Sequence, residues 1–245
     1  MESAGKLNRE LEFLPDEETL AERKVKKQGL TRPELSVLIS YVKGDLKQEL
    51  IESDLPDEPS LASEMNKVFP TALTKKFGKE LSEHQLRREI IATQIANDMV
   101  NHMGITFVDR LEQSTGASPS AIAQAWIIAR DIYRVDEWWN KIEALDYKVP
   151  ASLQLELMND LIRLVRRAVR WLLRNHRSEL SIQPHVDRFA TDIADISSQL
   201  PDYLADQSRA EWKKRFDDLV TKSVPEDVAS VTAGISYLYS ALGII

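Results

Sequence analysis

The sequence predicts an all-α protein, a multi-helix bundle of about ten helices with no significant sheet. Only eight of its 245 residues are glycine, and β-branched residues do not alternate with polar ones over a useful length. Apolar residues instead recur at helical spacing along most of the chain. Because 43% of the residues are apolar, a substantial core is expected.

The first two helices are indicated by their ends. A charged helix is expected over residues 16–28, ending at Gly29. The second begins at Thr31, because Thr31 and Glu34 have the spacing of a capping box, and it runs to about residue 53.

Prolines 56 and 59 interrupt the helical pattern, since proline blocks helix continuation and restricts the residue before it. We therefore divide the chain into an N-terminal helical segment, 1–54, and a main helical bundle, 55–245. The two segments are expected to pack as one unit. The apolar residues 241–245 suggest that the bundle continues beyond the end of the sequence.

A long helix is expected from about Ser82 to Met103, with Gly104 as its C-terminal cap. At about 100° per residue, its apolar side chains cover more than half of the circumference, which is typical of a buried helix. The predicted centre of the core consists of Leu86, Ile90, Ile91, Ile95, Met99, Val100 and Met103.

The later helices follow similar signals. Ser118 and Pro119 predict a helix start, and a tryptophan-bearing helix is expected over residues 136–145. A helix from Pro150 to about residue 175 and another over 183–198 follow, and Pro201 and Pro225 introduce the last two.

The sequence lacks the usual patterns of catalysis and cofactor binding. The glycines are too widely spaced for a dinucleotide or phosphate loop, and the histidines at 84, 102, 176 and 185 lack the spacing of a two-histidine metal site. No serine lies in a glycine-flanked nucleophile turn. We expect no catalytic residue, no cofactor-binding residue and no metal ligand in this chain.

Composition also indicates which kinds of partner and which cellular compartment to expect. A net charge of −7 gives no general attraction to nucleic acid or to an anionic membrane, and no segment has the length and apolarity of a membrane span. The absence of cysteine and of a secretory leader pattern favours a cytoplasmic protein.

Asp98 and His102 lie one turn apart on the long apolar helix. A carboxylate at that distance could hold a protonated imidazole, raise its pKa and form a pH-sensitive switch. We favour a structural pair, because buried polar groups usually have partners.

A second candidate is a basic stripe on the helix that starts at Pro150. Its six arginines lie within an arc of about 100°, opposite an apolar face. They are Arg163, Arg166, Arg167, Arg170, Arg174 and Arg177. The stripe could bind a phosphate-bearing ligand, nucleic acid or an acidic partner domain. We favour a solvated or internally paired face, with Asp192, Asp195, Asp217 and Asp218 as available partners.

The aromatic residues Trp126, Tyr133, Trp138 and Trp139 form a third candidate. Exposed, they would suit an interface. Their helical spacing favours the core instead.

Several long segments resemble the C-terminal region of the large bacterial NAD-dependent glutamate dehydrogenases. The similarity is carried by LTRPELSVLISYVK (30–43), HQLRREIIATQIANDMVNHMGITFVDRL (84–111), IEALDYKVPASLQLEL (142–157) and RAVRWLLRN (167–175). The opening LNRELEFLPDEETLAER (7–23) is similar to the stretch that follows the catalytic domain in that family.

The resemblance implies a parent enzyme that oxidises L-glutamate to 2-oxoglutarate and ammonium with NAD as hydride acceptor. Its catalytic and nucleotide-binding residues belong to the preceding domain, so none is carried over and this chain alone is expected to be inactive. The implied partners are the catalytic domain of the same polypeptide and further copies of the parent in a homo-oligomer. The implied role is structural, assembly-related or regulatory.

Two alternatives stay open. One is an independent helical adaptor that binds an acidic protein or nucleic acid through Arg163, Arg167, Arg170 and Arg174. The other is a module that binds an amino-acid effector between its helices.

Overall fold

The computed structural model describes residues 2, 5–176 and 180–244, which form thirteen α-helices and no strand. The predicted all-α class is therefore confirmed. The helices belong to two compact units, Met1–Val108 and Asp109–Ile245. The predicted boundary after residue 54 lies inside the first unit, so the structure groups the helices differently from the division at the prolines.

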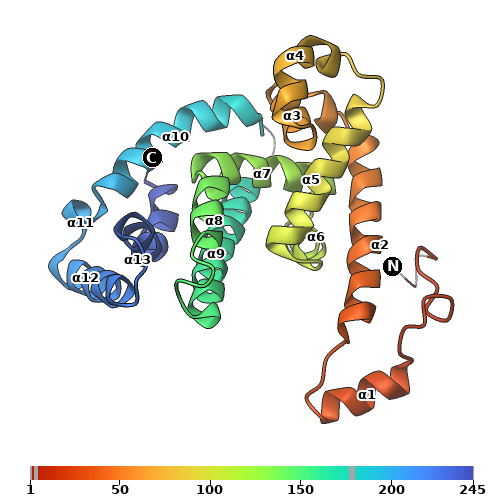
Figure 1. Cartoon of the computed structure of the whole chain (residues 1–245), viewed down its shortest axis with the longest axis horizontal. Helices are drawn as coiled ribbons and strands as arrows, with labels where there is room; N and C mark the ends of the chain where they lie inside the picture. Colours follow the sequence, from red (N-terminus) through yellow and green to blue (C-terminus); the bar gives the residue numbers. More distant parts are fainter. Residues whose placement is uncertain (1, 3–4, 177–179, 245) are drawn as a thin grey trace. The chain divides into compact units, whose positions relative to one another are not determined.

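The first unit is built on two helices, α2 (Arg32–Ile51) and α5 (Arg87–Met103), which pack on each other (Figure 1). The predicted capping box of α2 is present, because Thr31 Oγ1 accepts from the Glu34 amide and Glu34 accepts from the Thr31 amide. The segment after α2 forms two short 3₁₀ helices, Leu55–Asp57 and Pro59–Ser63. The prolines thus end α2 as expected, but the segment that contains them is itself locally helical.

Three shorter helices complete this unit: α1 (Glu17–Val25), α3 (Glu64–Val68) and α4 (Thr71–Ser82). Helix α1 ends before the predicted Gly29. Lys27 adopts the left-handed conformation (φ 54°), and the Gln28 amide donates to the Arg23 carbonyl at 2.8 Å. This turn closes the helix without glycine.

Helix α5 supplies the core of the first unit. Five of the seven predicted central residues are buried: Ile91, Ile95, Met99, Val100 and Met103. The prediction was wrong for Leu86, which is 55% exposed, and Ile90 is only partly buried. The reason is a break after α4, where the Leu86 amide donates to His84 Nδ1 at 3.1 Å and α5 starts only at Arg87.

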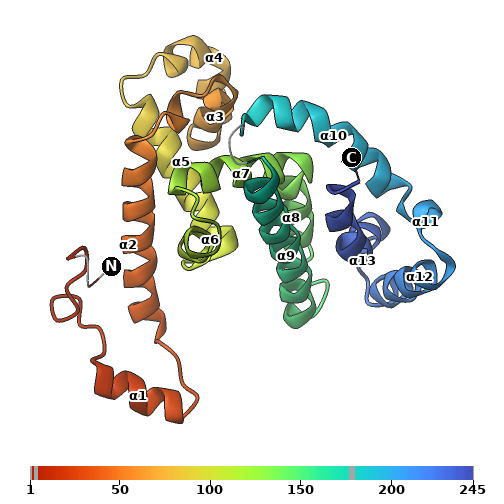
Figure 2. The same ribbon diagram turned by 180° about the vertical axis from the view of Figure 1, so that it is seen from behind.

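The second unit packs its helices around α9 (Ala151–Asn175), which contacts α7 (Pro119–Ile132), α8 (Val135–Glu143) and α13 (Glu226–Ala241). The remaining helices are α10 (Ile182–Ser198), α11 (Leu200–Tyr203) and α12 (Asp206–Thr221). The sequence division between the units, after Val108, falls within helix α6 (Phe107–Thr115). The opposite view of the same ribbon shows α8 and α9 side by side (Figure 2).

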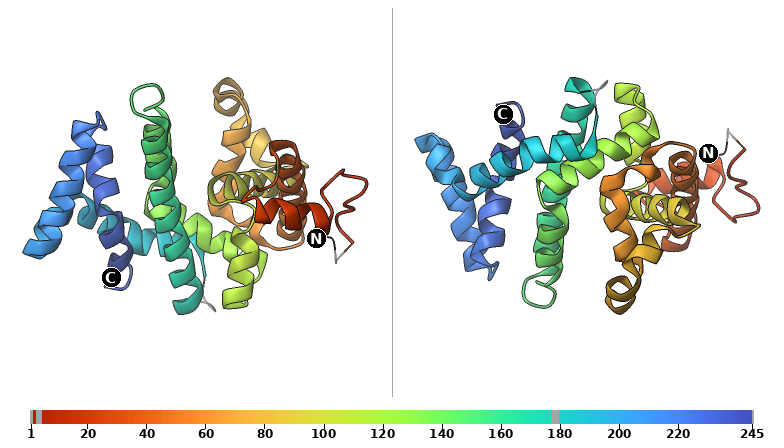
Figure 3. Two further views of the ribbon diagram at one scale, coloured as in Figure 1. Left: turned by 90° about the horizontal axis from the view of Figure 1, so that it is seen from below. Right: turned by 90° about the horizontal axis from the view of Figure 1, so that it is seen from above.

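Helices α12 and α13 form an adjacent pair in the second unit (Figure 3). Trp212 of α12 donates from Nε1 to the Ser230 carbonyl of α13 at 3.2 Å. Gly234 of α13 is in close contact with Leu200 of α11, because a Cβ atom on residue 234 would lie 2.2 Å from Leu200 Cδ2. The small residue therefore allows α11 to pack tightly on α13.

Candidate functional site

The basic stripe lies on α9, as predicted. Leucine, valine and alanine side chains on one side of α9 are buried, whereas Arg163, Arg167, Arg170 and Arg174 are exposed. Arg166 is partly exposed, and Arg177 lies outside the described residues. Helical periodicity thus places these four arginines on one solvent-facing side of the second unit.

The arginines differ in their contacts. Arg163 Nη1 donates to Asp160 Oδ1 at 3.1 Å, and Arg215 of α12 contacts Asp160 and, at 3.2 Å, Glu156. The Arg167 guanidinium lies 5.5 Å from the ring centre of Tyr239. No ion pair involves Arg170 or Arg174 in the part of the chain that the structure describes.

Asp160 is the centre of this arrangement and is only 9% exposed. Burial raises the pKa of its carboxyl, and the nearby Arg215 and Arg163 oppose that rise. Two of the expected partners pair elsewhere, since Asp217 accepts from Lys213 and Asp218 from Lys222, each at 2.7 Å. Each of these aspartates therefore pairs with a lysine four residues away along the chain.

Asp98 and His102 share the inner part of α5. Asp98 accepts from Gln94 Nε2 at 2.9 Å. Burial raises the Asp98 pKa, while the bond from Gln94 and the charges of Lys67 and His102 lower it. Glu64 of α3, which is 1% exposed, adds a further upward effect. The pH-switch hypothesis therefore concerns four charged or titratable groups rather than one pair, and it stays a prediction.

The aromatic set is divided by its environment. Trp126 and Tyr133 are buried, and Tyr133 donates from its hydroxyl to the Leu238 carbonyl at 3.2 Å. Trp138 and Trp139, in the middle of α8, are partly exposed. The core assignment thus holds for the first two residues only.

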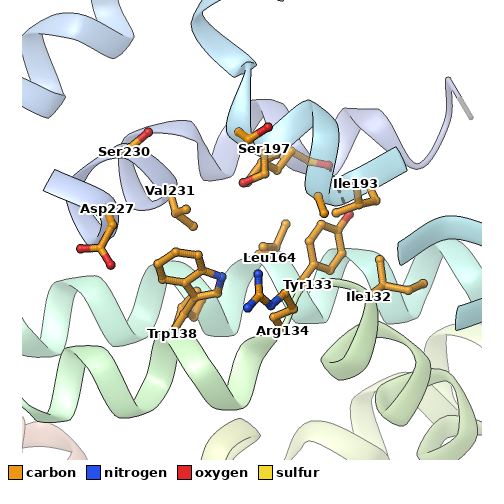
Figure 4. Close-up of a pocket in the computed structure, with 14 residues that line it drawn as sticks. Ile132, Tyr133, Arg134, Trp138, Leu164, Ile193, Ser197, Asp227, Ser230 and Val231 are labelled. Carbon is orange, nitrogen blue, oxygen red and sulfur yellow. Dashed lines mark hydrogen bonds between the residues drawn. The ribbon is translucent and has the colours of Figure 1, made fainter. Parts of the chain in front are cut away.

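Trp138 belongs to a cleft of about 240 Å³ among the helices of the second unit (Figure 4). Leu164 and Val231 contribute apolar walls, and Ser197 and Ser230 contribute hydroxyls. Two charged residues, Arg134 and Asp227, also line this cleft. Arg134 is paired with Glu137, and Asp227 accepts from Lys141 at 2.8 Å. Such a cleft would suit a small amphipathic molecule, and the amino-acid effector hypothesis stays a prediction.

Two further observations concern metals and membranes. Within the described residues, histidine and acidic side chains nowhere gather in a group of three or more that could hold a metal ion. In the same part of the chain, no helix has the length and apolarity needed to span a membrane.

The sequence analysis did not identify two residues that contact the basic stripe or its partners, Asp160 and Arg215. Asp160 falls on the otherwise apolar side of α9, and a lone acid at such a position was the available signal. Arg215 lies 55 residues away, so its approach to Asp160 depends on tertiary packing.

The fold is that of an all-α protein whose helices form two compact units. A family model described as the C-terminal part of glutamate dehydrogenase matches residues 27–245. The chain therefore belongs to the glutamate dehydrogenase C-terminal family, and the resemblance predicted from its sequence is confirmed.

Curated relatives agree with this family. The NAD-specific glutamate dehydrogenase of Pseudomonas aeruginosa is 50% identical over all 245 residues, and that of Halomonas elongata is 47% identical over the same length. The enzyme of Mycobacterium tuberculosis is 37% identical over 240 residues. The chain spans only 15% of the length of each of these relatives.

Proposed function

We propose that this chain is a non-catalytic, C-terminal helical domain of an NAD-dependent glutamate dehydrogenase. The observation that carries the proposal is the full-length alignment with enzymes of which it covers only 15%. The parent reaction is oxidation of L-glutamate to 2-oxoglutarate and ammonium, with NAD bound elsewhere in the polypeptide. The parent acts in the cytoplasm as a homo-oligomer.

The domain acts by packing on the preceding part of the same polypeptide, and its N-terminal segment, residues 5–26, makes that contact. Three apolar side chains support this proposal because they are strongly exposed: Leu11 at 74%, Phe13 at 91% and Val25 at 85%. Helix α1 buries none of its residues. These side chains are therefore free to contact another part of the polypeptide.

The segment is held to α2 by polar contacts. Tyr41 donates to Glu12 Oε1 at 2.6 Å, and Arg23 donates to Glu34 at 2.7 Å. Its apolar side chains thus stay available. The family model starts at residue 27, yet the relatives align over the whole chain. The segment is therefore suited to join the family domain to the rest of the polypeptide.

Calorimetric titration tests the main proposal. The chain is titrated with NAD and with L-glutamate, and then with the separately expressed upstream part of the polypeptide. We expect no tight binding of NAD, no turnover of L-glutamate, and measurable binding to the upstream part. Tight NAD binding by the chain alone would contradict a non-catalytic role.

A matched pair of variants tests the contact segment. Phe13→Ala should weaken binding to the upstream part, because it removes a large exposed apolar side chain. Tyr147→Ala is the control. Tyr147 is 99% exposed, and its φ of 61° is close to the 52° of Phe13, so the two substitutions have similar effects on the backbone. Equal affinities for the two variants would place the contact elsewhere.

A further inference from the structure

A basic pocket of about 220 Å³ lies between α9, α12 and α13 in the second unit. Three arginines contribute to its lining: Arg163 and Arg167 from α9, and Arg215 from α12. Ser236 of α13 adds a hydroxyl, and Asp160 also lines the pocket, in contact with Arg163 and Arg215. Two arginines of the basic stripe therefore line the same pocket as Arg215, a residue of a different helix.

The acids in contact with this group do not balance its charge. Asp160 contacts both Arg163 and Arg215, and Glu156 contacts Arg215 at 3.2 Å. Among the described residues no carboxylate contacts Arg167, whose guanidinium instead lies 5.5 Å from the ring centre of Tyr239. Three guanidinium groups against two carboxylates leave one positive charge, and Arg167 is the group that carries it.

We propose that this pocket binds a small oxyanion through a phosphate or carboxylate group, with Arg167 and Arg163 as its main ligands and Ser236 as an additional donor. Guanidinium groups present a planar set of donors that matches both kinds of oxyanion. The pocket is smaller than most sites for drug-sized ligands, which measure about 300–1,000 Å³. This inference does not depend on the proposed function of the domain.

Asp160 tunes the pocket. Its carboxylate draws Arg163 and Arg215 together and partly neutralises them, which prevents mutual repulsion in the unliganded protein. Burial raises the pKa of this carboxyl because it disfavours the charged form, and the charges of Arg215 and Arg163 counteract this effect. An anion that enters the pocket takes over part of the same neutralising role.

The experiment measures binding to the 245-residue chain by calorimetry and by thermal melting. Inorganic phosphate and succinate are titrated separately, and sodium chloride at matched ionic strength controls for general screening. We expect saturable binding and a rise in melting temperature for at least one probe, because a ligand of the native state stabilises it. The two arms show which oxyanion the pocket prefers.

Two variants of α9 separate the pocket from the stripe as a whole. Arg167→Gln should weaken binding about tenfold, the loss expected for one charge-assisted hydrogen bond. Arg170→Gln removes the same charge from the same exposed side of α9, outside the pocket lining, and should change affinity by no more than a few-fold. Equal effects would mean that the stripe attracts anions without a defined site, and would overturn the proposal.

Asp160→Asn supplies a change of opposite sign. It removes the negative charge that contacts Arg163 and Arg215, so the probe should bind more tightly than to the unaltered chain. Circular dichroism checks that the variant is folded. If neither probe binds saturably to the chain or to this variant, the pocket is not an anion site.

Discussion

Arg88 is a residue whose role follows from the carbonyls it satisfies. Its Nη2 donates to the Ile51 carbonyl at 2.8 Å and to the Ser53 carbonyl at 3.0 Å, at the C-terminal end of α2. Its Nη1 pairs with Asp57. Carbonyls at the C-terminal end of a helix have no amide donor within the helix. The Arg88 guanidinium supplies the missing donors.

Arg88→Ala should therefore lower the free energy of unfolding by about 1–3 kcal/mol, since it leaves polar groups without donors. Lys79→Ala in α4 is a suitable control, because Lys79 is exposed and no side-chain bond of this residue is found in the described structure. Denaturant unfolding of both variants measures the difference. A loss no larger for Arg88 than for Lys79 would show that water replaces the guanidinium without cost.

Gly104 ends α5 in a backbone conformation that side chains disfavour, with φ 84° and ψ 163°. Gly104→Ala should cost about 1–3 kcal/mol, although no atom would obstruct the new Cβ. The penalty would come from backbone strain alone. Thermal melting of the variant measures it, and an unchanged melting temperature would mean that the turn adapts.

These residues show what a sequence can indicate locally. Thr31 and Gly104 were identified as caps because a helix end depends on a few adjacent residues. The role of Arg88 could not be predicted, because its partners lie 31 to 37 residues away. Likewise the arginines of α9 followed from periodicity, whereas their meeting with Arg215 required the packing of α12.

At the scale of the element, the α1–α2 junction should depend on pH. The bond from Arg23 and the amide of Thr31 lower the Glu34 pKa to about 2. Because the folded-state pKa is below the unfolded value, the stabilisation is complete above about pH 4.5 and is lost as the pH falls toward 2. Hydrogen exchange at the α2 N-terminus should rise over this range. Glu34→Gln should remove the pH dependence, and its persistence in that variant would assign it to another acid.

Two glycines in helices form a matched pair. Gly44 of α2 has open space around its Cβ position, so Gly44→Ala should stabilise the protein by about 0.5–1 kcal/mol through helix propensity. Gly234→Ala gains the same propensity but forces Leu200 to move. We expect it to be less stable than Gly44→Ala by at least about 1 kcal/mol. Equal melting temperatures for the two variants would mean that Leu200 repacks freely.

Helix positions were predicted more accurately than helix ends. The strong proline and serine signals located α7 and α9, whereas α4 was missed because its exposed apolar residues Leu73 and Phe77 give no clear buried face. The expected long helix from Ser82 begins at Arg87, since His84 accepts the Leu86 amide and forms a turn. A side chain that competes for the backbone is difficult to recognise from periodicity alone.

At the scale of the whole molecule, each unit buries its own core. Ile95 of α5 is fully buried in the first unit, and Trp126 of α7 is 2% exposed in the second. The sequence predicted one unit centred on α5, because hydrophobic patterns show which residues are buried but not which of them share a core. The second core forms around the apolar side of α9, and the basic pocket lies beside it in the same unit.

Because each unit has its own core, a core substitution that creates a cavity in one unit should leave the stability of the other unit nearly unchanged. Ile95→Ala removes buried methyl groups from the first unit and should cost about 2–5 kcal/mol of its stability. Native-state hydrogen exchange should therefore accelerate in α2, α3 and α5, which pack together, and stay close to its original rate in α7, α9 and α13. Leu164→Ala in α9 is the reciprocal variant and should accelerate exchange in the second group only. Uniform acceleration in either variant would show that the two units unfold as one cooperative structure, which would extend the stabilising effect of any ligand in the arginine pocket to the entire chain.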